Sequence, residues 1–253
     1  MKKIWFIRHG ESESNAGLPT LKASSSGLTM HGREQAIYLS QYIPSVPDLI
    51  AVSSYTRSQQ TAEPIRDRFP SLPQKVWPVH EFTYLSSIHY LNSTVSDRRS
   101  AANQYWLKSD PDYIDGDQAE SFNQMITRVE KTNQLMNSDH HKFIIVISHG
   151  WFIRALLWHQ LLLDSQNGHS HTLNTIRSEK QISLLPYVYL HLSKSFKYNK
   201  RKMWHYLFFS ASIKLPNISI VEFETDNEQP ARFTKLIKEH IPSHLIRSSF
   251  LDR

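Results

Sequence analysis

The chain has 253 residues, of which 40% are hydrophobic and 21% charged, as expected for a globular protein with a substantial core. It contains no cysteine, which excludes disulfide scaffolds, thiolate metal sites and cysteine nucleophiles. The formal charge is +6, but residues 177–214 hold eight basic residues and one acidic residue, so the rest of the chain is nearly neutral. Because the basicity belongs to one segment, we do not expect a nucleic acid as partner.

The apolar runs are shorter than the ~20 residues that span a bilayer, so we expect no integral membrane segment. Residues Met1 to Lys3 lead directly into a short apolar run and a charged cluster, without the apolar region of a signal peptide. These features predict a cytoplasmic protein. They leave its oligomeric state open, and a homo-oligomer is compatible with them.

Short apolar runs alternate with amphipathic stretches along most of the chain. In chain order, the pattern predicts a strand at 4–7, a helix at 29–42 with Thr29 as its cap, a strand at 49–52, a helix start at 54–62, a strand at 75–79, a helix at 121–136, a strand at 143–147, a helix at 152–163 and an outer strand at 218–223. Alternating strands and helices are typical of a mostly parallel sheet covered on both faces. The predicted fold class is therefore α/β, a three-layer α/β/α sandwich in a single domain over residues 1–253.

Polar residues follow four of the predicted strands. Arg8 and His9 follow the first strand, His149 follows the strand at 143–147, and Arg57 and Glu81 lie just past two others. Ligands of open α/β sheets bind outside the carboxyl ends of the strands, so we expect these side chains to converge. Guanidinium groups suit phosphoryl oxygens, an imidazole can attack phosphorus, and a carboxyl group can protonate a leaving alkoxide. The set predicts phosphoryl transfer through a phosphohistidine.

The run Arg8-His9-Gly10-Glu11-Ser12, with Asn15 after it, resembles the signature of the histidine phosphatase superfamily, the phosphoglycerate-mutase-like proteins. Further motifs similar to those of the family follow in order at 27–36, 53–62, 80–82, 120–122, 148–150 and 215–223. Several ordered motifs are far more specific than a single short one.

The resemblance implies that His9 is the nucleophile and that Glu81 protonates the leaving group and then acts as base for water. It implies contacts to the phosphoryl group from Arg8, Arg57 and His149, and we expect further contacts from Ser12 and Asn15, which could instead cap turns. The alternative acid is Glu11. No metal and no cofactor is required by this mechanism.

Three other residue pairs have alternative interpretations. His140-His141 and His169 with His171 lack the carboxylate or cysteine pattern of a metal site, and we interpret them as solvated loop histidines. Arg98-Arg99 is similar to an arginine pair that mutases use on a second phosphate, but the surrounding mutase sequence is missing. We therefore expect a solvated helix face there.

The stretch at about 163–214 falls between two matched motifs, and we expect it to be a basic, aromatic helical insertion before the last strand. It could pack its aromatic residues on the core, or form a cap that admits anionic substrates. Attachment to an anionic membrane surface or to nucleic acid is the third alternative.

The sequence as a whole predicts a phosphomonoesterase, a hydrolase of the histidine acid phosphatase type, acting on a small anionic phosphate ester. One alternative is a cofactor-dependent phosphoglycerate mutase, which the chain length and the missing mutase loop disfavour. The other is a non-catalytic module that binds a phospho-ligand or a partner, which the intact motif disfavours.

Overall fold

The computed structural model describes residues 1–166, 199–226 and 231–246. Its centre is a six-stranded sheet in the order β3-β2-β4-β1-β5-β6. The strands are β1 (Lys2–Arg8), β2 (Leu49–Val52), β3 (Gln74–Val76), β4 (Phe143–Ser148), β5 (Ile220–Thr225) and β6 (Arg232–Ile237). The strands β3, β2, β4 and β1 pair in parallel, whereas β5 and β6 pair antiparallel. The mostly parallel sheet expected from the sequence is confirmed.

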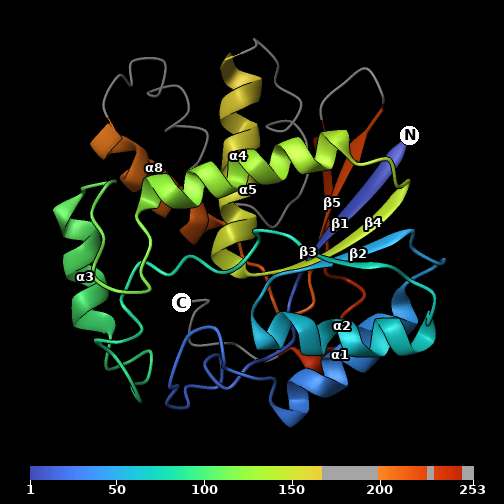
Figure 1. Ribbon diagram of the computed structural model, residues 1–253, viewed down its shortest axis with the longest axis horizontal. Helices are drawn as coiled ribbons and strands as arrows, with labels where there is room; N and C mark the ends of the chain where they lie inside the picture. The colour runs from blue at the N-terminus through green and yellow to red at the C-terminus, as the bar shows by residue number, and fades with distance from the viewer. Residues whose placement is uncertain (167–198, 227–230, 247–253) are drawn as a thin grey trace.

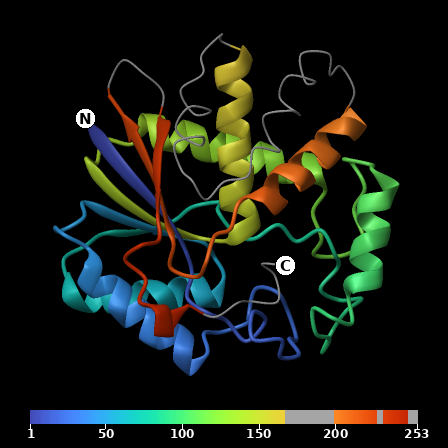
Figure 2. The same ribbon diagram turned by 180° about the vertical axis from the view of Figure 1, so that it is seen from behind.

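Helices cover both faces of this sheet. The helices of the described residues are α1 (Met30–Tyr42), α2 (Thr56–Arg68), α3 (Arg99–Lys108), α4 (Phe122–Ser138), α5 (Gly150–Gln166) and α8 (Asn199–Ser212), with a short 3-10 helix at Ser243–Leu245. Figures 1 and 2 show α1 and α2 on one face, α4, α5 and α8 on the other, and α3 apart at one side. The three-layer sandwich is therefore confirmed.

The alternation of side chains along β1 builds the two halves of the core. Ile4 and Phe6 point to the side of α4, α5 and α8, where they join the larger buried cluster. Trp5 and Ile7 point to the opposite side and pack with residues of α1 and α2. Because successive strand residues face opposite sides, an uninterrupted apolar run is what a strand buried on both faces requires. The loop that follows β1 is therefore fixed at the centre of the sheet.

Two helix starts follow directly from the local sequence. The side chain of Thr29 accepts a hydrogen bond from the backbone N–H of Gly32, as predicted for the cap of α1. Ser121 and Gln124 form a capping box at the start of α4, in which each side chain accepts from the other residue's backbone N–H. These caps anchor the two helices at the end of the sheet where the site forms.

The expected position of the strand at 218–223 is wrong in two respects. The strand begins at Ile220, and it is neither outer nor last, because β6 pairs along its free edge. Its alternation with Glu222 suggests an exposed face, but the Glu222 carboxylate is buried, where it accepts from Trp5 Nε1 at 2.8 Å and lies 3.3 Å from Lys235 Nζ. A paired buried carboxylate cannot be distinguished from a solvated one by sequence spacing alone.

The connection between β3 and α4 also differs from expectation. The strand β3 ends at Val76 rather than at residue 79, and α3 lies in a segment for which the sequence predicted no complete helix. Arg98 is the N-cap residue of α3 and is only partly exposed, so the expected solvated helix face is wrong for it. The long segment 77–121 therefore builds a wall beside the sheet rather than a plain surface loop.

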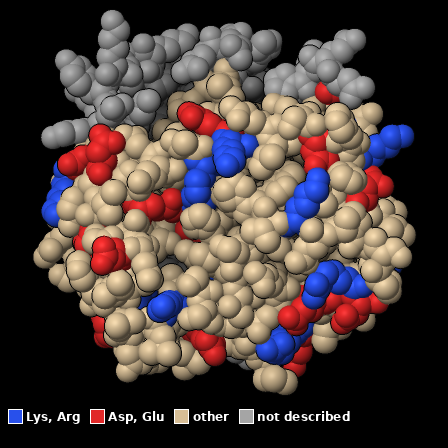
Figure 3. Space-filling model, in the orientation of Figure 1, with Lys and Arg blue, Asp and Glu red and all other residues tan. Residues whose placement is uncertain are grey.

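Most of the insertion expected at 163–214 lies outside the described residues, namely 167–198. In the described part, Tyr206 and Phe209 of α8 are buried in the larger core cluster, as expected if the aromatic residues pack on the core. No helix of the described ranges is long and apolar enough to cross a membrane. Basic and acidic side chains are interspersed on the face in Figure 3.

Candidate active site

The sheet brings His9 and His149 together because each directly follows one of two adjacent parallel strands. Arg8 is in register with Ser148, and the backbone N–H of His9 donates to the Ser148 carbonyl at 3.0 Å. The two imidazole ring centroids are 4.9 Å apart. Residues separated by 140 positions in the chain thus form one site at the carboxyl ends of β1 and β4.

The hydrogen bonds of His9 fix its ring proton on Nδ1 and its lone pair on Nε2. Nδ1 lies 2.6 Å from the Gly10 carbonyl, so it carries the proton, and Nε2 accepts from Arg57 Nε at 3.0 Å. Burial and the charges of Arg57 and Arg8 lower the pKa of His9 well below its ordinary value. His9, of which 2% is exposed, is therefore a neutral imidazole with a defined tautomer.

Two buried arginines flank this imidazole. Arg57 lies in the first turn of α2, where its guanidinium stacks over the Tyr55 ring at 4.9 Å and donates to the Ala23 carbonyl at 2.6 Å. Arg8 donates to the Leu215 carbonyl, in the chain segment that leads into β5. Guanidinium groups stay charged when buried and present fixed donors, so the site attracts a dianion.

His149 is held by a hydrogen bond to one of its two ring nitrogens. Its Nε2 is 2.7 Å from the Ser53 hydroxyl, which already accepts from the Tyr55 N–H and so has its own proton to donate. Nδ1 then carries the ring proton, and it is buried without a hydrogen-bond partner among the described residues. Burial, then the charge of Arg57, lowers the pKa of His149 well below its ordinary value. The result is a neutral donor beside His9.

Glu81 is fixed at the amino end of α5. Its Oε1 accepts from the backbone N–H groups of Trp151 at 3.1 Å and Phe152 at 3.2 Å, and from Phe82 N–H at 3.1 Å. Burial raises the pKa of the carboxyl group, and this effect exceeds the opposing effects of Arg57 and the Phe82 N–H. Oε2 has a longer contact of 3.4 Å with the Trp151 N–H, so a carboxyl group with a raised pKa that is held mainly by Oε1 is suited to donate a proton from Oε2.

The loop after β1 is closed by polar side chains. Asn15 Oδ1 accepts from the Ser12 N–H and from Asn217 Nδ2, each at 3.3 Å, and Asn217 also donates to the His9 carbonyl at 2.8 Å. Ile218 has a φ of 57°, a strained value for a β-branched residue, and its N–H donates to the Arg8 carbonyl at 2.9 Å. Ser12 and Asn15 thus cap a turn and also line the cavity described next.

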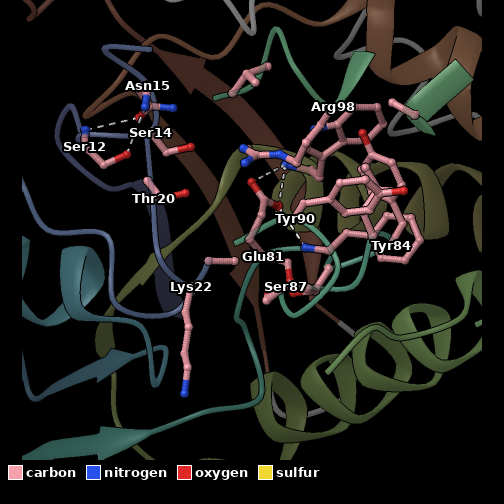
Figure 4. Close-up of a pocket in the computed structure, with 18 of the residues that line it drawn as sticks. Ser12, Ser14, Asn15, Thr20, Lys22, Glu81, Tyr84, Ser87, Tyr90 and Arg98 are labelled. Carbon is pink, nitrogen blue, oxygen red and sulfur yellow. Dashed lines mark hydrogen bonds between the residues drawn. The ribbon is translucent and has the colours of Figure 1, made fainter. Parts of the chain in front are cut away.

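The converging side chains open into one cavity of about 760 Å³. Its lining includes six of the seven predicted site residues, namely Arg8, His9, Ser12, Asn15, Arg57 and Glu81, whereas His149, whose ring is next to that of His9, is outside the lining. Figure 4 shows Glu81 between the loop of Ser12 and Asn15 on one side and Tyr84 and Tyr90 on the other.

The alternative acid, Glu11, does not line this cavity. Its Oε1 accepts from the Thr29 hydroxyl at 2.7 Å, so the carboxylate supports the start of α1. Within the described ranges, no group of three or more His, Cys, Asp or Glu side chains is arranged to hold a metal ion. His169 and His171 lie outside those ranges.

A family model described as the histidine phosphatase superfamily (branch 1) matches residues 4–181, more than half of the chain. The chain belongs to the histidine phosphatase superfamily. A search of curated protein sequences gives no significant match.

Solved structures of this type share the fold at low sequence identity. The α-ribazole phosphatase of Shigella flexneri is 19% identical, with a TM-score of 0.59 over 92% of this chain and 95% of that chain. A phosphoserine phosphatase mutant of Entamoeba histolytica is 18% identical, with a TM-score of 0.61 over 96% and 100%. A mycobacterial glucosyl-3-phosphoglycerate phosphatase is 17% identical, with a TM-score of 0.59 over 92% and 96%.

The structure adds cavity residues that the sequence analysis of this member of the superfamily did not place in the site. Arg154, one turn into α5, lines the cavity, and a Cβ on Gly150 would come within 2.9 Å of its Nη1 and 3.6 Å of Arg8 Nε. Glycine at 150 therefore lets the Arg154 guanidinium approach the helix start without moving, whereas the distance to Arg8 is an ordinary contact. Lys22 also lines the cavity, and so does the pair Arg98-Arg99, for which the sequence predicted a solvated helix face.

Proposed function

We propose that this protein is a phosphomonoesterase that forms a phosphohistidine on His9. The observation that carries the proposal is the hydrogen-bond pattern of His9, in which the backbone of Gly10 fixes the proton on Nδ1 and the guanidinium of Arg57 contacts the lone pair on Nε2. The guanidinium that touches the nucleophilic nitrogen is placed to take phosphoryl oxygens once that nitrogen bonds to phosphorus.

In the first step, His9 Nε2 attacks phosphorus and the bond from phosphorus to the leaving oxygen breaks. Glu81 gives its proton to that oxygen, and the alcohol leaves. In the second step, the Glu81 carboxylate takes a proton from water, the water oxygen attacks phosphorus, and the phosphorus–nitrogen bond breaks to release inorganic phosphate. Arg8, Arg57 and the Nδ1–H of His149 stabilise the charge on the oxygens throughout.

The charge of the cavity supports a small anionic substrate. Among the described residues, six basic side chains line it, namely Arg8, Lys22, Arg57, Arg98, Arg99 and Arg154, against the single carboxylate of Glu81. Arg8, Arg57 and Arg154 lie near the reacting histidine or the start of α5. Lys22, Arg98 and Arg99 lie on the surrounding segments, and their charges favour an ester that carries a second negative group in addition to its phosphate.

The proposal is tested by trapping the intermediate. Brief exposure to ³²P-labelled substrate is expected to give an acid-labile, alkali-stable phosphoenzyme that is absent in His9→Ala and retained in His140→Ala, in which an exposed histidine is removed. Phosphate release from a metabolite panel should persist in EDTA. A requirement for 2,3-bisphosphoglycerate would instead identify a mutase, and neither label nor release with any ester would indicate a binding module.

A further inference from the structure

Three aromatic side chains form a continuous wall of the cavity. Tyr84, Trp106 and Trp151, here called the aromatic triad, all line it and all contact one another. The ring centroids of Tyr84 and Trp106 are 5.8 Å apart, those of Tyr84 and Trp151 6.2 Å, and those of Trp106 and Trp151 5.7 Å with nearly parallel planes at 19°. Tyr84 and Trp151 are only partly buried, so the triad presents ring surface to the cavity.

The triad is adjacent to the group that would protonate the leaving oxygen. The backbone N–H of Trp151 donates to Glu81 Oε1 at 3.1 Å, and Tyr84 follows Glu81 by three residues. A leaving alcohol must place its oxygen at this carboxyl group. We therefore expect the atoms bonded to that oxygen to extend along Trp151 and Tyr84. Figure 4 shows Tyr84 on the same side of the cavity as Tyr90, next to Glu81.

The triad is held rigidly from behind. Tyr206, which is fully buried on α8, donates from its hydroxyl to the Trp151 carbonyl at 2.6 Å. Trp106 packs edge-on against Tyr105 with ring centroids 5.3 Å apart, and only 7% of its side chain is exposed. Burial raises the pKa of Tyr84 to about 12, so its hydroxyl is neutral at physiological pH. A preformed, uncharged ring surface favours a flat apolar partner over a hydrated polyol.

We propose that the aromatic triad binds a planar ring carried by the leaving alcohol, which makes phosphate monoesters of ring-bearing alcohols the preferred substrates. This inference rests on the proposed phosphatase function. The cavity of about 760 Å³ falls in the range that encloses a whole small ligand rather than a phosphate alone. One aromatic contact and the burial of its ring area correspond to a preference of about tenfold or more in kcat/KM.

The experiment compares esters with chemically similar leaving groups. Phosphate release is measured for n-propyl, 2-cyclohexylethyl and 2-phenylethyl phosphate, all primary alkyl esters, with wild type, Tyr84→Leu and Tyr113→Leu. Tyr113 belongs to the same segment and contacts Tyr105, but it does not line the cavity, so it is the matched control. We expect a preference for the phenyl ester of about tenfold over the propyl ester, reduced towards 1 in Tyr84→Leu and retained in Tyr113→Leu.

The outcomes separate the two proposals. Equal kcat/KM for the phenyl and propyl esters, or a phenyl preference that Tyr84→Leu leaves unchanged, would overturn the role of the triad while the phosphatase function stands. Equal preference for the cyclohexyl and phenyl esters would overturn recognition of a planar ring. Absence of release from every ester by wild type would overturn the phosphatase function itself. If Tyr84→Leu does not fold, inhibition of the wild-type protein tests the role of the triad instead. We expect 2-phenylethylphosphonate to bind about tenfold more tightly than propylphosphonate, and equal binding would overturn that role.

Discussion

Replacing Glu81 by glutamine separates its chemical role from its structural one. The amide keeps an oxygen that accepts the N–H groups of Trp151, Phe152 and Phe82, which now bind Oε1 at 3.1 to 3.2 Å. The variant should therefore fold, but it has no proton to give to a leaving oxygen. General acid catalysis contributes a factor of at least ~10², equivalent to about 2.7 kcal/mol of activation free energy.

The assay compares kcat/KM for an alkyl and an aryl phosphate. This parameter reports the steps up to the phosphoenzyme, so the later role of Glu81 as base for water does not enter. We expect a loss of about 10² or more for glycerol phosphate and a much smaller loss for p-nitrophenyl phosphate, whose leaving group needs little protonation. Glu11→Gln is the matched control, because its carboxylate lies off the cavity, on Thr29. Equal losses on both substrates would refute the assignment of Glu81 as the acid.

Three further outcomes follow from the same geometry. Burial lowers the pKa of His9, which must be neutral to attack, and raises the pKa of Glu81, which must be protonated. We therefore expect kcat/KM to be greatest at acid pH and to decline as Glu81 ionises. A pH–rate profile in which Glu81→Gln retains the full alkaline decline would contradict this assignment. Arg128 Nη1 donates at 2.9 Å to the carbonyls of both Pro78 and His80, and its guanidinium pairs with the Glu120 carboxylate at 2.5 Å. Arg128→Gln should therefore lower the free energy of unfolding, measured by urea denaturation, by about 3 kcal/mol. A change below about 1 kcal/mol would show that these contacts are not needed for stability. Because Arg98 lines the cavity, Arg98→Gln should raise KM for 2-carboxyethyl phosphate about fivefold at low salt and less at high salt, with little effect on KM for propyl phosphate. Equal changes in KM for both esters would reject a role of Arg98 in recognising a second negative charge.

The sequence by itself determined the order of the main elements, and it predicted the residues of the candidate site. Short-range signals suffice for this, because a strand that is buried on both faces must be apolar throughout, and a cap such as Thr29 needs only the N–H three residues later. The same reasoning located His9 and His149 at strand ends, and parallel pairing then puts strand ends at one edge. The low-identity fold neighbours agree with this architecture.

The tertiary structure decided features that depend on contacts between distant residues. Glu222 has the alternation of an exposed residue, but Trp5, which lies 217 positions earlier in the chain, donates a hydrogen bond to its buried carboxylate. The pairing of β6 along the edge of β5 makes β5 an inner strand. Glu11 and Glu81 both follow strands, and only their packing partners direct Glu81 into the cavity and Glu11 to the start of α1. The aromatic triad joins residues 84, 106 and 151, whose spacing carries no periodic signal. Side-chain direction and burial arise from packing between elements. Those two properties distinguish the candidate acid Glu81 from Glu11, and they bring the aromatic triad together as one wall of the cavity.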